Sequence, residues 1–276
     1  MWSAARPSGR RPVPEPLGSG RAGAYLRRLG VERPAAADAA ALRDLHLRHQ
    51  RSVPFENLSI HLGQDIVLTE TALVDKVVGG RGGFCYELNG AFGALLRALG
   101  YDVTLLAARV FGKDGELGPP YDHLALRVVP SDGSGPWLAD VGFGRHSHYP
   151  LDYASRDEQQ DPAGVFRLVE TPDGDVDVLH DGRPQYRLEQ RPRELRDFEA
   201  TCWWQRTSPR SHFRQSLVCT RLTEAGRVTI SGRTLVLTTA EGDREQRELA
   251  ADEVLPAYRE HFGITLDREP VVAPLP

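Results

Sequence analysis

The spacing of apolar and polar residues divides this chain into a helical first part and a strand-rich remainder. Between positions 84 and 99, apolar side chains recur every three or four residues, and Gly100 follows them. This pattern predicts a buried helix that begins near Phe84 and ends at Gly100. The same periodicity, less complete, predicts earlier helices at 24–29, 38–48 and 69–78. The chain up to Gly100 therefore predicts a small bundle of helices.

After Gly100 the apolar pattern becomes that of short β-strands. Runs rich in β-branched and aromatic residues alternate with Gly-, Asp- and Pro-rich turns at a spacing of roughly ten residues. The expected strands lie at 103–110, 123–129, 137–141, 165–170, 176–180 and 186–190. Such spacing is typical of an antiparallel sheet or barrel. The last part returns to mixed structure, with strands expected at 216–222, 227–230 and 234–237 and an amphipathic helix at 251–262.

Composition is that of a soluble globular protein and excludes several partners. The 276 residues are 26% charged and 40% hydrophobic, and no apolar run approaches the roughly 20 residues of a membrane span. A net charge of −4 provides no electrostatic reason to expect nucleic acid or an anionic membrane. Three cysteines do not suit a disulfide scaffold, so we expect a reducing cytoplasm. Residues 1–20, rich in Arg, Pro, Gly and Ser, predict a disordered extension without the apolar segment of an export signal.

Cys85 is the strongest candidate for chemistry. Glycines at 79, 80, 82 and 83 prevent a regular element before Phe84, so Cys85 falls on the first turn of the predicted helix. Unpaired N–H groups and the helix dipole favour an anion at that position, which lowers the pKa of a thiol and favours the nucleophilic thiolate. The alternative is a structural cysteine in the core. A helix start cleared of side chains favours the nucleophile, because a thiolate must admit a large acyl donor.

A reactive cysteine needs a base and a group that orients the base. His123 begins a predicted apolar strand, and Asp140 ends the next one. Adjacent antiparallel strands would bring the two side chains together, and Cys85, His123 and Asp140 would then form a triad suited to acyl transfer. Alone, His123 could be a core histidine and Asp140 could cap a turn.

Two other polar motifs are weaker candidates, for metal binding. His146 and His148 have no further ligands clustered around them, so a solvated loop is the simpler interpretation. The acidic segment 173–177 lacks the glycine and terminal glutamate of a calcium loop and reads as a charged hairpin. We therefore expect no metal.

Several motifs, in this order, resemble those of the arylamine N-acetyltransferase family of bacterial type, and the likeness runs over nearly the whole chain after residue 20. The matching segments are Val53-Pro-Phe-Glu-Asn-Leu58, Arg81-Gly-Gly-Phe-Cys-Tyr-Glu-Leu-Asn89, His123-Leu-Ala125, Asp140-Val-Gly-Phe-Gly144 and Thr207-Ser-Pro-Arg-Ser-His-Phe213. The sequence departs from many members at Arg145, where a further glycine is common.

The resemblance implies an α+β fold of three regions with the triad between the first two. These would be a helical bundle at 21–100, an antiparallel β-barrel at 101–205 and an α/β lid at 206–276. It also implies a ping-pong reaction, in which acetyl-CoA acetylates Cys85 and an aromatic amine or hydrazine then takes the acetyl group. By the same resemblance, Arg81 would pair with Glu56 as a structural contact.

The resemblance also assigns residues to the ligands. Three aromatic residues would line the substrate pocket, namely Phe55, Phe143 and Phe213. Six residues would contact the cofactor, namely Gly142, Phe143, Gly144, Ser208, Ser211 and Phe213. Three arginines lie near these segments in the sequence and could meet the phosphates of CoA, namely Arg145, Arg210 and Arg214.

Other functions are compatible with parts of this pattern. An amide synthase of the same fold would take a thioester-bound polyketide and form an amide without CoA. A cysteine hydrolase of papain or transglutaminase type would let water or an amine attack the thioester. A catalytically silent binding module is disfavoured by the intact Cys, His and Asp. Acceptor choice distinguishes the enzymes, and a stoichiometric acyl-enzyme distinguishes all of them from a binding module.

Overall fold

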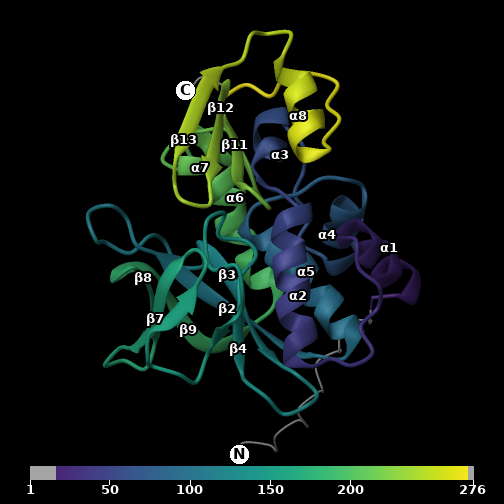
Figure 1. Cartoon of the computed structure of the whole chain (residues 1–276). Coiled ribbons are helices and arrows are strands. Elements are labelled where there is room, and N and C mark those ends of the chain that lie inside the picture. The colour runs from purple at the N-terminus through teal and green to yellow at the C-terminus, as the bar shows by residue number, and fades with distance from the viewer. Residues whose placement is uncertain (1–16, 273–276) are drawn as a thin grey trace, which may run out of the picture.

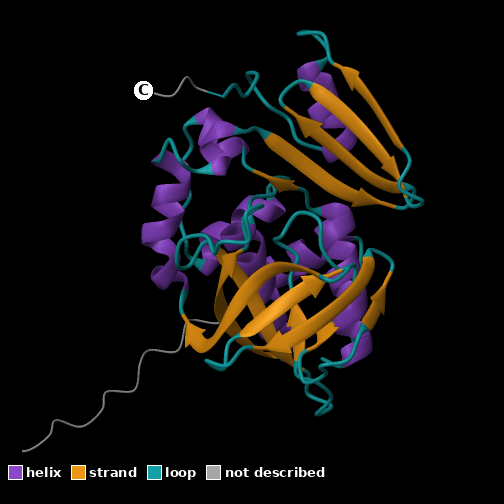
Figure 2. Ribbon diagram, turned by 90° about the vertical axis from the view of Figure 1, so that its left-hand side faces the viewer, coloured by secondary structure: helices purple, strands orange, loops and turns teal. Residues whose placement is uncertain are grey.

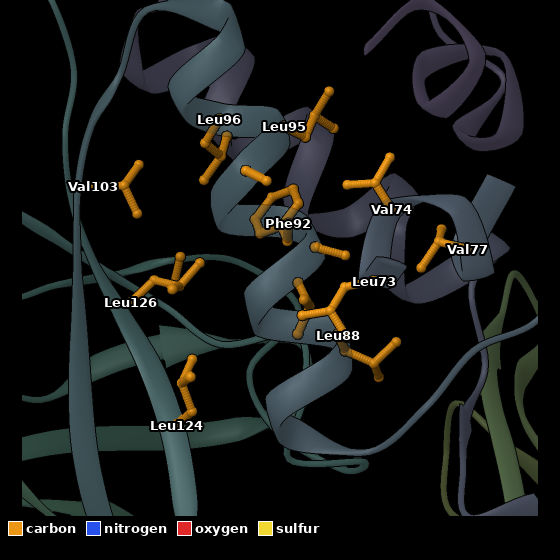
Figure 3. Packing of buried hydrophobic residues seen from close by; sticks show 14 of the residues in the cluster. Leu73, Val74, Val77, Leu88, Phe92, Leu95, Leu96, Val103, Leu124 and Leu126 are labelled. Atoms are coloured by element: carbon orange, nitrogen blue, oxygen red, sulfur yellow. The ribbon is translucent and has the colours of Figure 1, made fainter. Parts of the chain in front are cut away.

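Helix α5 (Cys85–Leu99) lies at the centre of the protein, as its apolar spacing predicts. In the computed structural model, which describes residues 17–272, every residue from Cys85 to Leu96 is buried. Leucine and valine side chains of α4 (Glu70–Val78) pack on one side of α5, and those of strands β2 (Asp102–Val110) and β3 (His123–Val129) pack on the other (Figure 3). The helix that carries the candidate nucleophile is thus fixed from both sides.

The other helices of the first region surround α5. They are α1 (Ser19–Leu29), α2 (Ala39–Ser52), α3 (Leu58–Leu62) and α4. Asp38 caps α2 by accepting a hydrogen bond from Ala41 N at 2.8 Å, as the sequence predicts. Residues 1–16 of the predicted extension lie outside the described residues, and Ser19 and Gly20 already belong to α1.

An eight-stranded antiparallel sheet forms the second region and curls into a nearly closed barrel (Figure 2). Its order is β5-β4-β3-β2-β9-β8-β7-β6. The strands are β2 (Asp102–Val110), β3 (His123–Val129), β4 (Trp137–Ala139), β5 (Leu151–Asp152), β6 (Gln159–Asp161), β7 (Gly164–Glu170), β8 (Val176–His180) and β9 (Arg183–Arg193). Strands β3 and β4 pair directly, with Leu126 opposite Ala139, which brings His123, the first residue of β3, near Asp140, the residue that follows β4.

The third region is a five-stranded sheet covered by one helix, at the top of Figure 1. The elements are β10 (Val218–Thr223), β11 (Gly226–Ser231), β12 (Thr234–Thr239), β13 (Arg244–Glu248) and α8 (Val254–Phe262). The remaining strand, β1 (Phe55–Glu56), comes from the helical region and pairs with β10. Phe55 therefore lies opposite Thr220, and this pairing joins the first region to the third.

Two stretches differ from the sequence-based expectation. The barrel strands end at Arg193, and the following residues are helical, in η1 (Leu195–Phe198), α6 (Glu199–Thr207) and α7 (His212–Gln215). Phe198 and Cys202 pack into the core of the helical region, because the chain crosses back over it. Strand β13 has only exposed polar residues and therefore no apolar pattern to reveal it. Within the described residues, no helix is long and apolar enough to cross a membrane.

Candidate active site

Cys85 is the first residue of α5 and is 3% exposed. The turn before it is closely packed: a Cβ at Gly82 would lie 1.9 Å from Pro54 O, and one at Gly83 would lie 2.5 Å from Glu87 Cβ. These two glycines are therefore required by packing inside the protein. That they also clear a path for an acyl donor stays a prediction.

His123 and Asp140 form a buried pair at the ends of their strands. His123 Nε2 donates to Asp140 Oδ2 at 2.7 Å, and the side chains are 3% and 1% exposed. Among the described residues, the other ring nitrogen, Nδ1, has no hydrogen-bond partner. The Cys85 thiol donates to the carbonyl oxygen of Asp122, the residue before His123, at 3.7 Å. The structure thus brings the three predicted side chains to one place, and His123 Nδ1 has no hydrogen-bond partner among the described residues.

Asp140 is held as an anion by donors from two regions. Asn89 Nδ2 donates to Asp140 Oδ1 at 2.8 Å, and Gly142 N donates to the same oxygen at 2.9 Å. Burial acts to raise the pKa of Asp140, but His123 and the Asn89 amide outweigh it and hold that pKa well below its usual range. A fixed carboxylate of this kind orients an imidazole and stabilises the imidazolium that forms during a reaction.

Opposing effects act on the Cys85 thiol. Burial raises its pKa, and the neighbouring carboxyl groups of Asp122 and Asp140 act in the same direction. The N-terminus of α5 and a proton acceptor at His123 act in the other direction. Asp122 is itself buried, and burial raises the pKa of its carboxyl to about 6 although Val110 N donates to it at 3.0 Å.

Aromatic side chains from all three regions surround this group. Phe213 of α7 packs edge-to-face on Phe84, with ring centroids 5.2 Å apart, and lies 6.1 Å from the ring of Phe55. Phe143 packs edge-to-face on His123 at 5.2 Å. The three aromatic residues predicted for the pocket therefore lie close to Phe84, which precedes Cys85, or to His123.

The sequence profile of the N-acetyltransferase family matches residues 38–271 of this chain. An arylamine N-acetyltransferase / N-hydroxyarylamine O-acetyltransferase of Salmonella typhimurium is 36% identical over 216 residues, which cover 75% of each chain. An arylamine N-acetyltransferase of Escherichia coli is 33% identical and covers 88% of each chain. The solved arylamine N-acetyltransferase of Mycobacterium smegmatis superposes with a TM-score of 0.80 at 34% identity, over 88% of this chain and 91% of that one.

This chain belongs to the arylamine N-acetyltransferase family. Membership makes it an acyltransferase, and the structural match confirms the predicted α+β fold class. A further family structure, from Mycobacterium marinum in complex with CoA, matches with a TM-score of 0.79 at 31% identity, over 87% of this chain and 92% of that one.

The residues predicted to bind the cofactor of this N-acetyltransferase have different surroundings in the structure. A Cβ at Gly142 would lie 2.8 Å from Cys85 Cα, so this glycine allows the turn 140–144 to pack against α5. Gly144 has a φ of +88°, a conformation that favours glycine. Ser208 Oγ accepts from Arg210 N at 3.2 Å. Ser211 is fully buried and donates its hydroxyl to Gln205 Oε1 at 2.5 Å, so it does not offer that hydroxyl to a cofactor in this structure.

Two buried glutamates and two half-buried cations form a cluster beside the turn that precedes Cys85, which we call the turn cluster: Glu56, Glu87, Lys76 and Arg81. Arg81 Nη2 lies 2.9 Å from Glu56 Oε1, and Glu56 is fully buried. Lys76 Nζ lies 2.5 Å from Glu87 Oε1 and 3.9 Å from Glu56. The predicted contact between Arg81 and Glu56 is confirmed.

Two buried residues that sequence reasoning did not assign hold the Asp140 turn. Asn89 Oδ1 accepts from Val141 N at 2.9 Å, in addition to the Nδ2 contact with Asp140. His46 Nε2 accepts from Asp140 N at 3.1 Å, and its Nδ1 donates to a backbone carbonyl. Asn89 could have been found, because a polar residue four positions after Cys85 lies on the same face of an otherwise apolar helix. His46 stands on α2 far along the chain, and no local pattern indicates its partner.

Proposed function

We propose that this chain transfers an acetyl group from acetyl-CoA to an aromatic amine or hydrazine through a thioester on Cys85. The observation that supports this most is the buried cysteine at the start of α5, beside a His123–Asp140 pair with a hydrogen bond of 2.7 Å. CoA is supported as the carrier by the Mycobacterium marinum relative, whose structure was determined in complex with CoA.

In the first half-reaction His123 Nδ1 accepts the proton of the Cys85 thiol, and the thiolate attacks the carbonyl carbon of the acetyl thioester. The bond between that carbon and the CoA sulfur breaks. CoA leaves as a thiol after taking the proton back from His123. Asp140 stabilises the positive charge that His123 carries between these two proton transfers.

In the second half-reaction the amine nitrogen attacks the acetyl carbon on Cys85. His123 accepts a proton from the nitrogen as the new C–N bond forms, and the proton then returns to the Cys85 sulfur as the C–S bond breaks. The aromatic rings of Phe55, Phe143 and Phe213 would hold the ring of the acceptor by stacking or edge contacts. Burial of the site reduces competition from water at the thioester.

Mass spectrometry of the protein after incubation with acetyl-CoA and no amine tests this function. We expect one acetyl group on the peptide that contains Cys85, and its loss when an arylamine is added. Cys85→Ser should abolish transfer, because a hydroxyl at this position is not appreciably ionised. Cys202→Ser and Cys219→Ser are matched controls and should retain transfer. Cys219 lies in the lid core, and Cys202, which shares a core with Cys85, has no hydrogen bond to His123 or Asp140 within the described residues.

The result also separates the alternatives. Full turnover by Cys85→Ala would refute the mechanism. No acetyl-enzyme and no CoA binding by calorimetry at millimolar concentration would favour the amide synthase, which needs a carrier-bound acyl chain instead. An acetyl-enzyme that water discharges as fast as an arylamine does would favour the hydrolase.

A further inference from the structure

The chain enters β3 through a residue in the left-handed conformation. Tyr121 has a φ of +63°, which is rare for residues other than glycine. Its carbonyl oxygen accepts from Tyr86 Oη at 2.8 Å, and the carbonyl oxygen of the next residue, Asp122, accepts from the Cys85 thiol at 3.7 Å. Successive carbonyl groups of an extended strand point to opposite sides. The turn at Tyr121 therefore lets two consecutive carbonyl groups face the first two residues of α5.

The carboxyl group of Asp122 holds this turn against β2. The ladder between β2 and β3 ends with Ala108 opposite His123, so the amide of Val110 lies beyond the last backbone pair. Asp122 Oδ1 accepts from Val110 N at 3.0 Å and takes the place of a backbone partner on β3. A side chain that binds the backbone in this way ends a ladder locally. The contact thus fixes the direction in which the Asp122 carbonyl group points.

Close packing fixes the carboxyl group itself. Asp122 is 8% exposed, and it forms no ion pair within residues 17–272. A Cβ at Gly118 would lie 2.0 Å from Asp122 Oδ2, so only glycine leaves room for this oxygen. Gly118 N also donates to Val110 O at 2.8 Å, which ties the covering segment to the same residue of β2. A buried carboxyl group without a cation costs stability, which favours a role at the site over a role in holding the fold.

We propose that Asp122 is a positioning residue for the nucleophile and holds the Cys85 thiol beside the start of β3, where His123 lies. It acts through its own carbonyl oxygen, which its carboxyl group directs at the thiol. The inference rests on the proposed function, because it assumes that Cys85 reacts with the help of His123. It adds a residue that sequence reasoning did not select, since an aspartate before a strand is common in turns.

The same carboxyl group acts on the thiol through its charge. A carboxylate near a thiol raises the pKa of that thiol, whereas placement of the thiol beside a proton acceptor lowers it. The titratable and charged groups around the carboxyl group and the thiol are Arg109 on β2, His123 on β3, Tyr86 on α5, Asp140 after β4 and Cys202 on α6. Position and charge therefore have opposite effects, and two variants of Asp122 can separate them.

The pH at which iodoacetamide labels Cys85 tests the proposal. Asp122→Asn keeps an oxygen that can accept from Val110 N and removes the charge, so labelling should begin at lower pH than in the wild type. Asp122→Ala also removes the contact, so the thiol should lose its place beside His123 and label at higher pH, toward the free-thiol value of about 8.5. Single-turnover acetylation should stay within about twofold in Asp122→Asn and slow by about 10- to 100-fold in Asp122→Ala, the loss typical of one hydrogen bond to a charged group.

Gly118→Ala makes the same change from the other side of the contact. Its Cβ would displace the Asp122 carboxyl group without removing the charge, so labelling should again move to higher pH. Asp152→Ala is the matched control, because Asp152 Oδ1 accepts from Ala154 N at 2.9 Å at the end of β5 and forms no hydrogen bond to α5 within the described residues. This control should keep the labelling profile and the acetylation rate of the wild type.

A shift to higher pH in Asp122→Ala and Gly118→Ala, with no shift in that direction in Asp122→Asn, supports the proposal. Any other result overturns it and leaves Asp122 as part of the fold only. If Asp122→Ala does not fold, the comparison of Gly118→Ala with Asp122→Asn decides alone. Labelling needs no acetyl donor, so it separates this inference from the proposed function. The expected shifts in a protein that forms no acetyl-enzyme would support the positioning role and refute the transferase mechanism.

Discussion

Replacing Arg81 by glutamine should destabilise the protein without removing the chemistry. Arg81 Nε donates to Glu56 Oε1 at 3.0 Å, and Glu56 is fully buried while Arg81 is 17% exposed. Glu56 Oε2 accepts from Leu58 N at 2.7 Å, so the carboxylate cannot turn toward solvent without breaking the backbone contact after β1. Glutamine would leave Glu56 with one fewer cation in the turn cluster.

The size of the decrease in the free energy of unfolding depends on the contacts that Glu56 keeps after Arg81 is replaced. Removing one partner of a fully buried pair costs about 3–5 kcal/mol. Lys76 Nζ stays 3.9 Å from Glu56 Oε1, and Arg81 is partly solvated before the change. We therefore expect a decrease of about 2–3 kcal/mol in the free energy of unfolding, which corresponds to a Tm lower by about 4–12 °C for a chain of this size.

Urea denaturation of the wild type, Arg81→Gln and Arg21→Gln measures the free energy of unfolding of each protein. Arg21 pairs with Asp75 at 2.7 Å, but both side chains are about half exposed, so this control should leave stability almost unchanged. The rate of Cys85 acetylation per folded molecule should change little in Arg81→Gln. A variant as stable as the wild type would refute the reasoning, and a stable but inactive one would place Arg81 in contact with substrate.

The same pair predicts a pH dependence of stability. Burial acts to raise the pKa of Glu56, but Lys76 and Arg81 outweigh it, so that pKa is lowered in the folded protein. The stabilisation is therefore complete above the unfolded pKa of about 4.3 and is lost as pH falls through the lower folded value. Arg81→Gln should lose less stability than the wild type below about pH 4.3, and equal losses would contradict this assignment.

Two further predictions concern the catalytic group. Asn89→Ala removes a donor to Asp140 and an acceptor for Val141 N. It should slow single-turnover acetylation of Cys85 by about 10- to 100-fold. An unchanged rate would show that His123 and Gly142 are enough to hold the Asp140 carboxylate in place. We expect iodoacetamide to label Cys85 even near pH 6, well below the free-thiol value, because a thiolate paired with His123 beside the Asp140 carboxylate stays nucleophilic there. Labelling that begins only at or above the free-thiol pKa of about 8.5 would refute the ion pair, and burial of Cys85 acts in that direction.

The elements around the nucleophile could be predicted because their sequences report burial directly. Helix α5 is apolar at nearly every position that touches α4, β2 or β3, so its periodicity was complete. Strands β3 and β4 are short apolar runs, and their pairing places His123 beside Asp140. In both cases one local pattern determined the element and the position of its polar end residue.

The remaining parts depend on contacts that no local pattern records. Strand β13 is exposed along its whole length, and its pairing with β12 comes from backbone hydrogen bonds. The segment 195–205 was assigned to the barrel, yet Phe198 and Cys202 find their apolar partners in the helical region. The hydroxyl of Ser211 donates to Gln205, six residues earlier, whereas the sequence motif alone suggested a hydroxyl available to the cofactor.

The turn from Asp140 to Gly144 shows why residue types were easier to predict than their partners. Asn89 and His46 hold its first residues from two different helices, and Arg227 holds its last carbonyl from the lid, 83 residues further along the chain. Each contact needs a donor or acceptor of the right kind, and many side chains of the sequence could supply one. Only the packing of α2, α5 and β11 around the barrel edge selects these three. The position of the Asp140 carboxylate, and with it the orientation of His123, is therefore a property of the assembled fold rather than of the motif that contains it.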